Sequence, residues 1–216
     1  MEKWKKNKRF IILTSLITLL PVMAGIFLWQ KLPDQMATHF DFQNVPNGWS
    51  SKTFAVFGLP LFILAAHLFC TFYTSADPKR QHINDKLYRL VLLLCPAVSV
   101  ICGIVTYGYA LNFKFDMGLF SKLFIGLLFL VIGNYLPKCK QNYTVGIKLP
   151  WTLDNEDNWN YTHRFAGWLW VFTGLFFILA SLINLTYTWI LPAATIAAAF
   201  VPCIVSFLYY QKQKKL

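Results

Sequence analysis

Long stretches without charged residues are the feature that most restricts what this chain can fold into. Five such stretches, with a single cation among them, are present at residues 10–30, 53–76, 90–113, 117–137 and 165–211. A helix needs about 20 apolar residues to cross the hydrocarbon core of a bilayer. The last stretch is long enough for two crossings. Its polar residues 184–188, followed by Pro192, predict a tight turn between two spans.

These stretches predict an all-α integral membrane protein with six transmembrane helices. Of the 216 residues, 56% are hydrophobic and only 13% are charged, a composition that excludes an ordinary soluble domain. The basic start, followed by an apolar run with the small residues Val22 and Ala24, also resembles a signal peptide cleaved after residue 24. Because the apolar run continues to Trp29, it favours a retained membrane anchor.

The distribution of cations predicts the orientation of the spans. Sixteen of them flank alternate ends of the predicted helices: Lys3, Lys5, Lys6, Lys8, Arg9, Lys79, Arg80, Lys86, Arg89, Lys138, Lys140, Lys148, Arg164, Lys212, Lys214 and Lys215. The opposite ends carry four: Lys31, Lys52, Lys114 and Lys122. Cytoplasmic loops are enriched in Lys and Arg, so both termini are predicted to be cytoplasmic. The net charge of +11 then matches anionic membrane lipid rather than nucleic acid.

No familiar catalytic, phosphate-binding or metal-binding motif is found in the sequence. Cysteines are odd in number and absent from the predicted outer loops, which argues against a disulfide framework. We therefore predict no enzymatic activity, no cofactor and no bound metal. Two rival interpretations stay open. A small-solute transporter would use His67, Asn134 and His163 as polar path residues, and a membrane enzyme would use His39, Asp41 or His163 with a metal.

The loop at residues 31–52, KLPDQMATHFDFQNVPNGWSSK, is the largest predicted outward-facing surface. Its Leu-Pro pair ends the first span, its Asn-Gly pair predicts a turn, and THFDF predicts a short extended segment. A ligand from outside the cell would meet this loop first. The candidate binding residues are His39, Phe40 and Asp41. The alternative is a loop that rests at the membrane interface, anchored by Phe42 and Trp49.

The segment NYTVGIKLPWTLDNEDNWNYTHR, residues 142–164, has more structure-forming residues than a simple connector needs. We predict that Asp154 caps a helix whose first turn holds Glu156 and Asp157. This helix continues into the fifth span, and five of its residues fall on one stripe: Trp159, Thr162, His163, Ala166 and Trp170. Trp151 is expected to fold back against that stripe. The segment is thus predicted to be a folded element, with an interfacial aromatic belt as the alternative.

Small residues recur every seven positions along the fifth span, at Gly167, Gly174 and Ser181. Such a face permits close helix packing within a membrane. The expected partner is the sixth span, with its Ala193, Ala194, Ala197 and Ala198.

The stretch GNYLPKCKQNYTVGIKLPWTLDNEDNWNYTHRFAG, residues 133–167, resembles the SdpI family of bacterial membrane proteins. The similarity runs through an ordered Asn, Gly-Ile-Lys, Pro-Trp-Thr-Leu, Trp and His-Arg pattern. Lys148 stands where many members have Arg, and Leu149 where a small polar residue is common. The 31–52 loop is similar to the family's amino-terminal domain of unknown function. This resemblance predicts a division into residues 1–76 and a four-span region at 77–216, which contains residues 138–164, here called the signature loop.

The resemblance implies a non-enzymatic immunity protein of the bacterial plasma membrane. Such a protein protects a cell from a secreted, membrane-active peptide toxin met on the outer side, and as a receptor it also recruits a cytoplasmic transcriptional repressor. The candidate binding residues implied for the family motif are Asn134, Asn142, Gly146, Lys148, Pro150, Trp151, Thr152, Trp159, His163 and Arg164.

Overall fold

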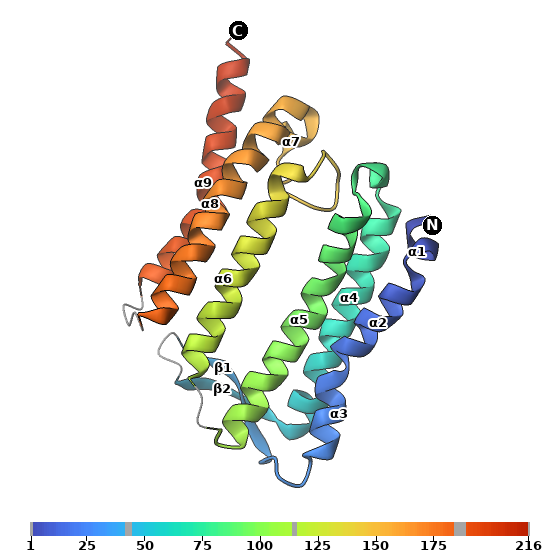
Figure 1. The fold of residues 1–216 in the computed structure, drawn as a ribbon, viewed down its shortest axis with the longest axis vertical. Helices are drawn as coiled ribbons and strands as arrows, with labels where there is room; N and C mark the ends of the chain where they lie inside the picture. The colour runs from blue at the N-terminus through green and yellow to red at the C-terminus, as the bar shows by residue number, and fades with distance from the viewer. Residues whose placement is uncertain (1, 42–44, 114–115, 184–188, 216) are drawn as a thin grey trace. The chain divides into compact units, whose positions relative to one another are not determined.

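The computed structural model describes residues 2–41, 45–113, 116–183 and 189–215. The predicted turn at 184–188 and the positions of Phe42 and Lys114 therefore lie outside the described residues. The chain forms two compact units, whose ribbons are drawn in Figure 1. Among the described residues, three long apolar helices lie in each unit. The first comprises residues 1–76 and 85–115, and the second comprises 77–84 and 116–216. These units group helices by contact, whereas the predicted division after residue 76 concerns sequence domains and stays a prediction.

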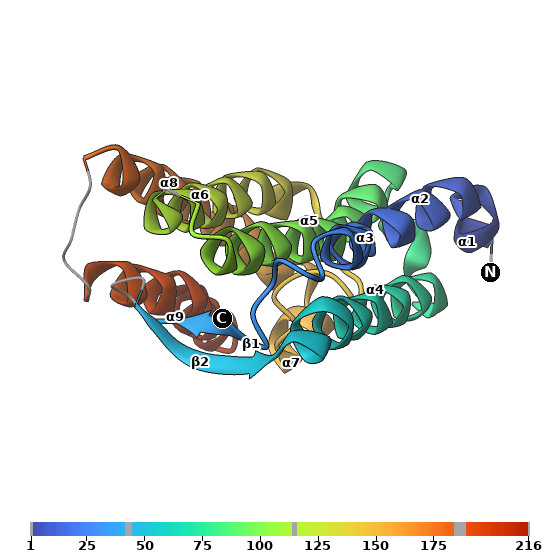
Figure 2. The ribbon, with the colours of Figure 1, turned by 90° about the horizontal axis from the view of Figure 1, so that it is seen from below.

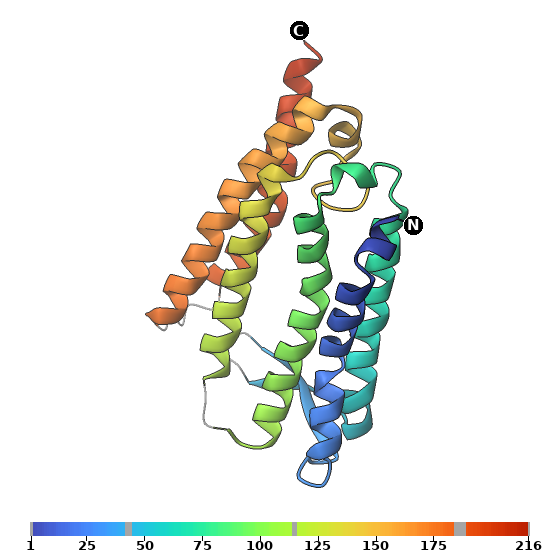
Figure 3. The same cartoon turned by 45° about the vertical axis from the view of Figure 1, so that its right-hand side comes forward.

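The first unit is a three-helix bundle with a two-stranded sheet at one end. Its elements are α1 (Glu2–Lys6), α2 (Lys8–Thr18), α3 (Leu20–Phe27), β1 (Gln35–Phe40), β2 (Pro46–Ser51), the π-helical turn η1 (Phe54–Gly58), α4 (Leu59–Ala76) and α5 (Asp85–Ala110). Helices α2 and α3 follow one another along the bundle (Figure 3), and α2 packs against both α4 and α5. Buried polar pairs tie the bundle together, such as Thr14 Oγ1 and His67 Nε2 at 3.1 Å.

The first predicted span is interrupted at Leu19, between α2 and α3. Pro21 has no N–H to donate, so it cannot continue the hydrogen-bond ladder of α2. Helix α5 supplies polar groups at this break: Ser99 Oγ donates to Thr18 O and Tyr107 OH donates to Pro21 O, both at 2.8 Å. Backbone groups freed inside a membrane must find such partners, because the lipid supplies none. The break is therefore a stabilised feature of the bundle.

The 31–52 loop contains an antiparallel hairpin, so the prediction of an all-α chain was incomplete. Its strands β1 and β2 pair from Gln35 opposite Ser51 to Phe40 opposite Pro46, with a bulge around His39. Figure 2 shows this ribbon at the end of the first unit, leading into α4. Residues 38–40 of the predicted extended segment lie in β1 as expected, whereas the prediction of a turn at the Asn-Gly pair was wrong, because Asn47 and Gly48 lie within β2. Met36 anchors the base of the hairpin in a buried core with Val56 and Tyr107.

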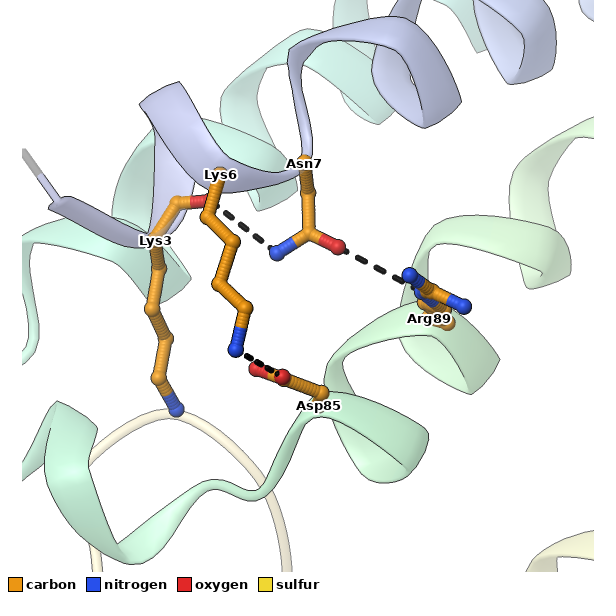
Figure 4. A network of polar contacts seen from close by, with 5 residues as sticks. All are labelled: Lys3, Lys6, Asn7, Asp85 and Arg89. Carbon is orange, nitrogen blue, oxygen red and sulfur yellow. Dashed lines mark hydrogen bonds and ion pairs between the residues drawn. The ribbon is translucent and has the colours of Figure 1, made fainter.

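Polar contacts at the other end of this unit hold the amino terminus against the start of α5 (Figure 4). The Lys6 ammonium pairs with the Asp85 carboxylate, and Arg89 Nε donates to Asn7 Oδ1 at 3.4 Å. Asn7 is buried and donates in turn to Lys3 O at 3.1 Å. The basic start is thus a folded part of this unit.

The second unit combines three long helices with a compact loop. Its elements are η2 (Arg80–His82), α6 (Met117–Tyr135), η3 (Leu136–Lys138), α7 (Pro150–Asp154), α8 (Glu156–Leu182) and α9 (Ile190–Gln213). Figure 1 shows α8 between α6 and α9, and α8 packs against both of them. Pro202 has no N–H group, so the carbonyl of Ala198, four residues earlier, lacks the usual helical hydrogen bond. Trp170 Nε1 donates to that carbonyl at 2.8 Å and so links α8 to α9.

The seven-residue face of α8 packs against α6, so the expectation that it faces the last span was wrong. An added Cβ at Gly174 would lie 2.6 Å from Gly126 O, and one at Gly133 would lie 2.9 Å from Gly167 O. Ser181 Oγ extends the same face by donating to Leu119 O at 3.2 Å. The reason is that α6 carries its own glycines seven residues apart. Two glycine faces allow backbones to approach more closely than a glycine face and an alanine face.

Six helices in the described part of the chain are long and apolar enough to cross a membrane: Lys8–Phe27, Phe54–Ala76, Asp85–Ala110, Gly118–Lys138, Glu156–Leu182 and Ile190–Gln213. Their large apolar side chains are widely exposed, more than half in each of these cases: Met23, Phe27, Phe62, Phe69, Trp168, Phe172 and Ile204. Soluble monomers rarely expose apolar surface on this scale, whereas lipid-facing helices do. The predicted six-span, multi-pass architecture agrees with this structure. The cytoplasmic location of the termini stays a prediction.

Candidate functional site: the signature loop

The signature loop begins with a turn built around the Asn142 side chain. Its Oδ1 accepts hydrogen bonds from the N–H groups of Thr144 and Val145, at 2.9 and 2.7 Å. Its Nδ2 donates back to Lys140 O at 2.8 Å and Val145 O at 3.0 Å. Asn142 is fully buried. A single amide side chain therefore replaces the regular backbone hydrogen bonds that this turn lacks.

Gly146, which follows this turn, packs directly against His163. Gly146 has a φ of 118°, and an added Cβ there would lie 2.4 Å from His163 Nε2. Such a φ is strained for any residue with a side chain. The Ile147 N–H donates to His163 Nε2 at 3.0 Å, and the opposite ring nitrogen, Nδ1, donates to Trp159 O at 2.8 Å. Because Nε2 accepts, the imidazole is in its neutral Nδ1–H form.

The buried side chain of Trp159 packs against the loop. Its ring stacks on His163 with centroids 4.0 Å apart, and its Nε1 donates to Cys139 O at 2.7 Å. The predicted stripe of α8 is borne out as one buried face: Trp159, Thr162, His163 and Ala166 are buried and Trp170 is half-buried. An interfacial belt would leave these rings at the surface, so the prediction of a folded element is confirmed.

The short helix α7 turns the chain from the loop into α8. Thr152 Oγ1 accepts from Leu149 N and donates to Ile147 O, both at 2.9 Å. The residue that caps α8 is Asn155, whose Oδ1 accepts from Asn158 N at 2.9 Å. The prediction of Asp154 as the cap was therefore wrong by one residue. The reason is that α7 runs to Asp154, so the chain first becomes extended at Asn155.

Trp151 contacts α9 rather than the stripe on α8, which corrects the expectation that it folds back. Its ring stacks on Tyr210 with centroids 5.8 Å apart, and its Nε1 donates to Ser206 Oγ at 2.9 Å. The fully buried Ser206 hydroxyl also donates to Asn158 Oδ1 at 2.7 Å. Thr162 Oγ1 lies 2.7 Å from Ser206 Oγ and completes the cluster. These hydrogen bonds link α7, α8 and α9 to one another through Ser206.

Residues of the 77–84 connection also contribute to the loop, and no feature of the sequence predicted their part in it. Asp77 Oδ2 accepts from Tyr143 N and Thr144 Oγ1, both at 2.9 Å. The side chain of Gln141 donates to Thr152 O at 2.9 Å, and its backbone oxygen lies 2.7 Å from His82 Nδ1. More than fifty residues separate Asp77 and His82 from their partners. No local pattern in the sequence reveals such a pairing.

The predicted binding residues divide into two classes. Four are buried inside the loop and make its internal contacts, and the half-buried Gly146 packs between them: Asn142, Thr152, Trp159 and His163. Four are exposed: Asn134, Lys148, Pro150 and Arg164. Trp151 is half-buried against α9. Only the exposed residues present side chains that a ligand could contact directly. Among them, Asn134 Oδ1 accepts a hydrogen bond from Lys138 Nζ at 3.2 Å.

The candidate residues of the 31–52 loop lie in the hairpin of the first unit. His39 is exposed, whereas Phe40 and Asp41 are half-buried. Phe40 and Trp49 both contact the ring of Tyr109 edge-on, with centroids 5.3 and 6.3 Å apart. Trp49 nevertheless keeps 54% of its surface exposed. The hairpin thus presents an aromatic surface held by α5.

The chemistry available in the loop is that of a structural element. Both ring nitrogens of His163 are engaged in hydrogen bonds, and burial raises the pKa of the Cys139 thiol to about 11. A thiol with such a pKa stays protonated near neutral pH and is a poor nucleophile. Among the described residues, no group of three or more His, Cys, Asp or Glu side chains is placed to hold a metal ion.

Comparisons with known proteins show which family this chain resembles. Residues 138–206 match the SdpI/YfhL protein family, and residues 16–64 match a domain of unknown function, DUF1648. The chain is 27% identical over 214 residues to the immunity protein SdpI of Bacillus subtilis (strain 168), covering 96% of this chain and 97% of that protein. No solved structure matches the chain. The predicted resemblance to the SdpI family is therefore confirmed, and the relative it points to is an immunity protein rather than an enzyme.

Proposed function

We propose that this chain is an immunity protein of the bacterial plasma membrane that protects its cell from a secreted, membrane-active peptide toxin. The observation that carries the proposal is the similarity to an immunity protein along 96% of the chain. The similarity includes the signature loop, whose buried motif residues make its internal hydrogen bonds. In this proposal both termini are cytoplasmic.

The two candidate surfaces take different parts in this function. The toxin meets the 31–52 loop from outside, at His39, Phe40 and Asp41 and at the exposed Trp49, which contacts the same Tyr109 ring as Phe40. The signature loop, on the cytoplasmic side, stabilises or reports the toxin-bound state. Its exposed residues Lys148 and Arg164 are then available to a cytoplasmic partner such as a transcriptional repressor, which would make the protein a receptor as well.

Survival of a toxin-sensitive bacterium that expresses the chain tests the proposal. Cells with the full-length protein should grow at concentrations of purified peptide toxin that kill cells carrying the empty vector. Membrane abundance of the protein is measured in the same cultures. Sensitivity equal to that of the vector control, with the protein present in the membrane, would contradict the proposed function.

The orientation is tested with single cysteines in a background without native cysteine. Cys139 itself is unsuitable as a reporter because it is buried and its pKa is raised. The exposed positions Val45 and Lys140 serve instead. Val45→Cys should react with a membrane-impermeant maleimide in whole cells, and Lys140→Cys only after permeabilisation. The opposite pattern would reverse the predicted topology.

A further inference from the structure

The connection between α4 and α5 belongs to a different unit from the two helices it joins. Helix α4 ends at Ala76 and α5 begins at Asp85, and both are part of the first unit. Residues 77–84 between them fold with the second unit, which contains the signature loop. Two peptide bonds, after residues 76 and 84, therefore link spans of the first unit to a segment that is bonded to the signature loop.

Asp77 makes the central contacts of this segment. Its side chain is buried, with 2% of its surface exposed. One carboxylate oxygen accepts from Lys79 N at 2.7 Å, and the other accepts from Tyr143 N and Thr144 Oγ1. A carboxylate accepts hydrogen bonds on both of its oxygens and has no donor of its own. The position thus requires that chemistry rather than a particular volume.

The partners of Asp77 are the residues that shape the signature loop. Thr144 and Tyr143 follow directly after Asn142, whose amide forms the turn above Gly146. The neighbouring Lys79 ammonium lies 5.4 Å from the Tyr143 ring centroid and pairs with the Gln141 side chain. A movement of the connection would therefore pull first on residues 141–144.

We propose that Asp77 is a positioning residue that holds the signature loop in its functional shape and ties that shape to the spans on either side of residues 77–84. The inference rests on the proposed function for its biological meaning, because the loop shape matters only if the loop contributes to protection. Its structural part concerns the purified full chain alone. The two parts are therefore tested by separate measurements.

Cys139 is a native reporter for the shape of the loop. Its Sγ lies 3.4 Å from both Val145 O and Asn142 Nδ2, and the side chain is buried. A thiol reagent reaches it only when the loop opens. With the other four cysteines replaced, the labelling rate of purified full-length protein in detergent at fixed pH measures this opening.

Asp77→Ala should raise the labelling rate about tenfold or more, because it leaves hydrogen-bond donors of the loop unpaired. Asp77→Asn fills the same volume but places an N–H group opposite a donor, so it should open the loop nearly as much. Thr144→Val should have a smaller effect. Asp154→Ala is the matched control, since it removes an exposed carboxylate from the same unit.

The combination of Asp77→Ala and Thr144→Val separates a direct contact from general destabilisation. If Asp77 acts through Thr144, the double variant should label little faster than Asp77→Ala alone. Additive effects, or restoration of slow labelling by Asn at position 77, would overturn the proposal. Thr144→Val keeps the proposal testable if the Asp77 variants fail to insert into the membrane.

Protection against the toxin then tests the link to function. Asp77→Ala should lose protection at normal membrane abundance, and Asp154→Ala should keep it. Full protection by a variant whose Cys139 labels rapidly would overturn the role of the loop shape. Failure of the unaltered chain to protect would instead contradict the proposed function, and the labelling rates alone would then decide whether Asp77 holds the loop.

Discussion

The 31–52 loop and the signature loop differ in how they use the side chains that make them distinctive. The hairpin of the 31–52 loop is held by backbone pairing and by a small apolar core, while His39 and Trp49 stay exposed. The signature loop has no strand pairing, and its fold depends on the buried side chains of Asn142, Thr152 and His163.

This contrast separates residues that shape a loop from residues that are available to a ligand. A motif residue that is buried and hydrogen-bonded inside the loop determines its shape, so its loss acts on the whole loop. An exposed residue on a hairpin acts on contacts made with a partner. Substitutions of the buried residues in the signature loop should therefore act on its structure, whereas those of Phe40 and Asp41 in the hairpin should act on protection with a smaller effect on structure.

The largest effect is expected from the stacked pair in the signature loop. Trp159→Ala should destabilise the loop by about 3–5 kcal/mol, because it removes a fully buried indole. His163→Ala should open the loop too, since it removes the acceptor for Ile147 N. The double variant should be little worse than either change alone, as judged by Cys139 labelling and by proteolysis of residues 138–164 in inverted vesicles. Strict additivity would show that the loop is not one unit.

A glycine in each region makes the comparison sharper. Gly146→Ala combines an unfavourable φ with a clash against His163 and should cost about 3 kcal/mol or more. Gly48→Ala adds a Cβ 2.8 Å from the Cβ of His39, the exposed residue paired with it at the bulge. Because Gly48 does not have a positive φ, this change should cost less. Thermal unfolding of the two purified variants gives the comparison. Equal destabilisation would contradict the claim that only the signature loop depends on tight internal packing.

The sequence predicted the elements whose signals are local. Long uncharged runs indicated the six spans, and the period of 3.6 residues placed Trp159 and His163 on one buried face. Residues 38–40, which lie in β1, were expected to be extended for the same kind of reason. Each of these signals lies within about twenty residues of chain, which is the range over which periodicity carries information.

Features that depend on distant partners were missed or misplaced. The glycine face of α8 was assigned to the wrong helix, although Gly126 and Gly133 show the same seven-residue spacing and could have revealed the true partner. The contact of Trp151 with Ser206 and the bonds of Asp77 join residues more than fifty positions apart. Nothing in a single sequence ranks such pairs, because many polar residues could satisfy the same donor.

A smaller effect on stability, but a direct effect on protection, is expected at the hairpin. Phe40→Ala together with Asp41→Ala removes an aromatic contact with Tyr109, worth about 0.5–1.5 kcal/mol, and the hydrogen bond that Asp41 Oδ1 accepts from Val45 N at 2.9 Å. It leaves the signature loop unchanged. Protection against the toxin should fall at normal membrane abundance, with slow Cys139 labelling retained. Unchanged protection would favour the alternative of a loop that only rests at the membrane interface.

The smallest effect compares two neighbouring residues at the start of α8. Asn155 caps the helix through a hydrogen bond to Asn158 N, whereas the carboxylate of Asp154 ends α7 and is exposed. Loss of a cap costs about 1 kcal/mol, so Asn155→Ala should lower the midpoint of thermal unfolding slightly and raise Cys139 labelling a few-fold. Asp154→Ala should leave both values close to those of the unaltered protein. A larger loss at Asp154 than at Asn155 would return the cap to the position that the sequence alone predicts. It would also show that the junction between α7 and α8 differs from the one that the Asn155 cap defines. Equal and negligible changes would mean that the buried cluster around Ser206 fixes this corner without help from the cap.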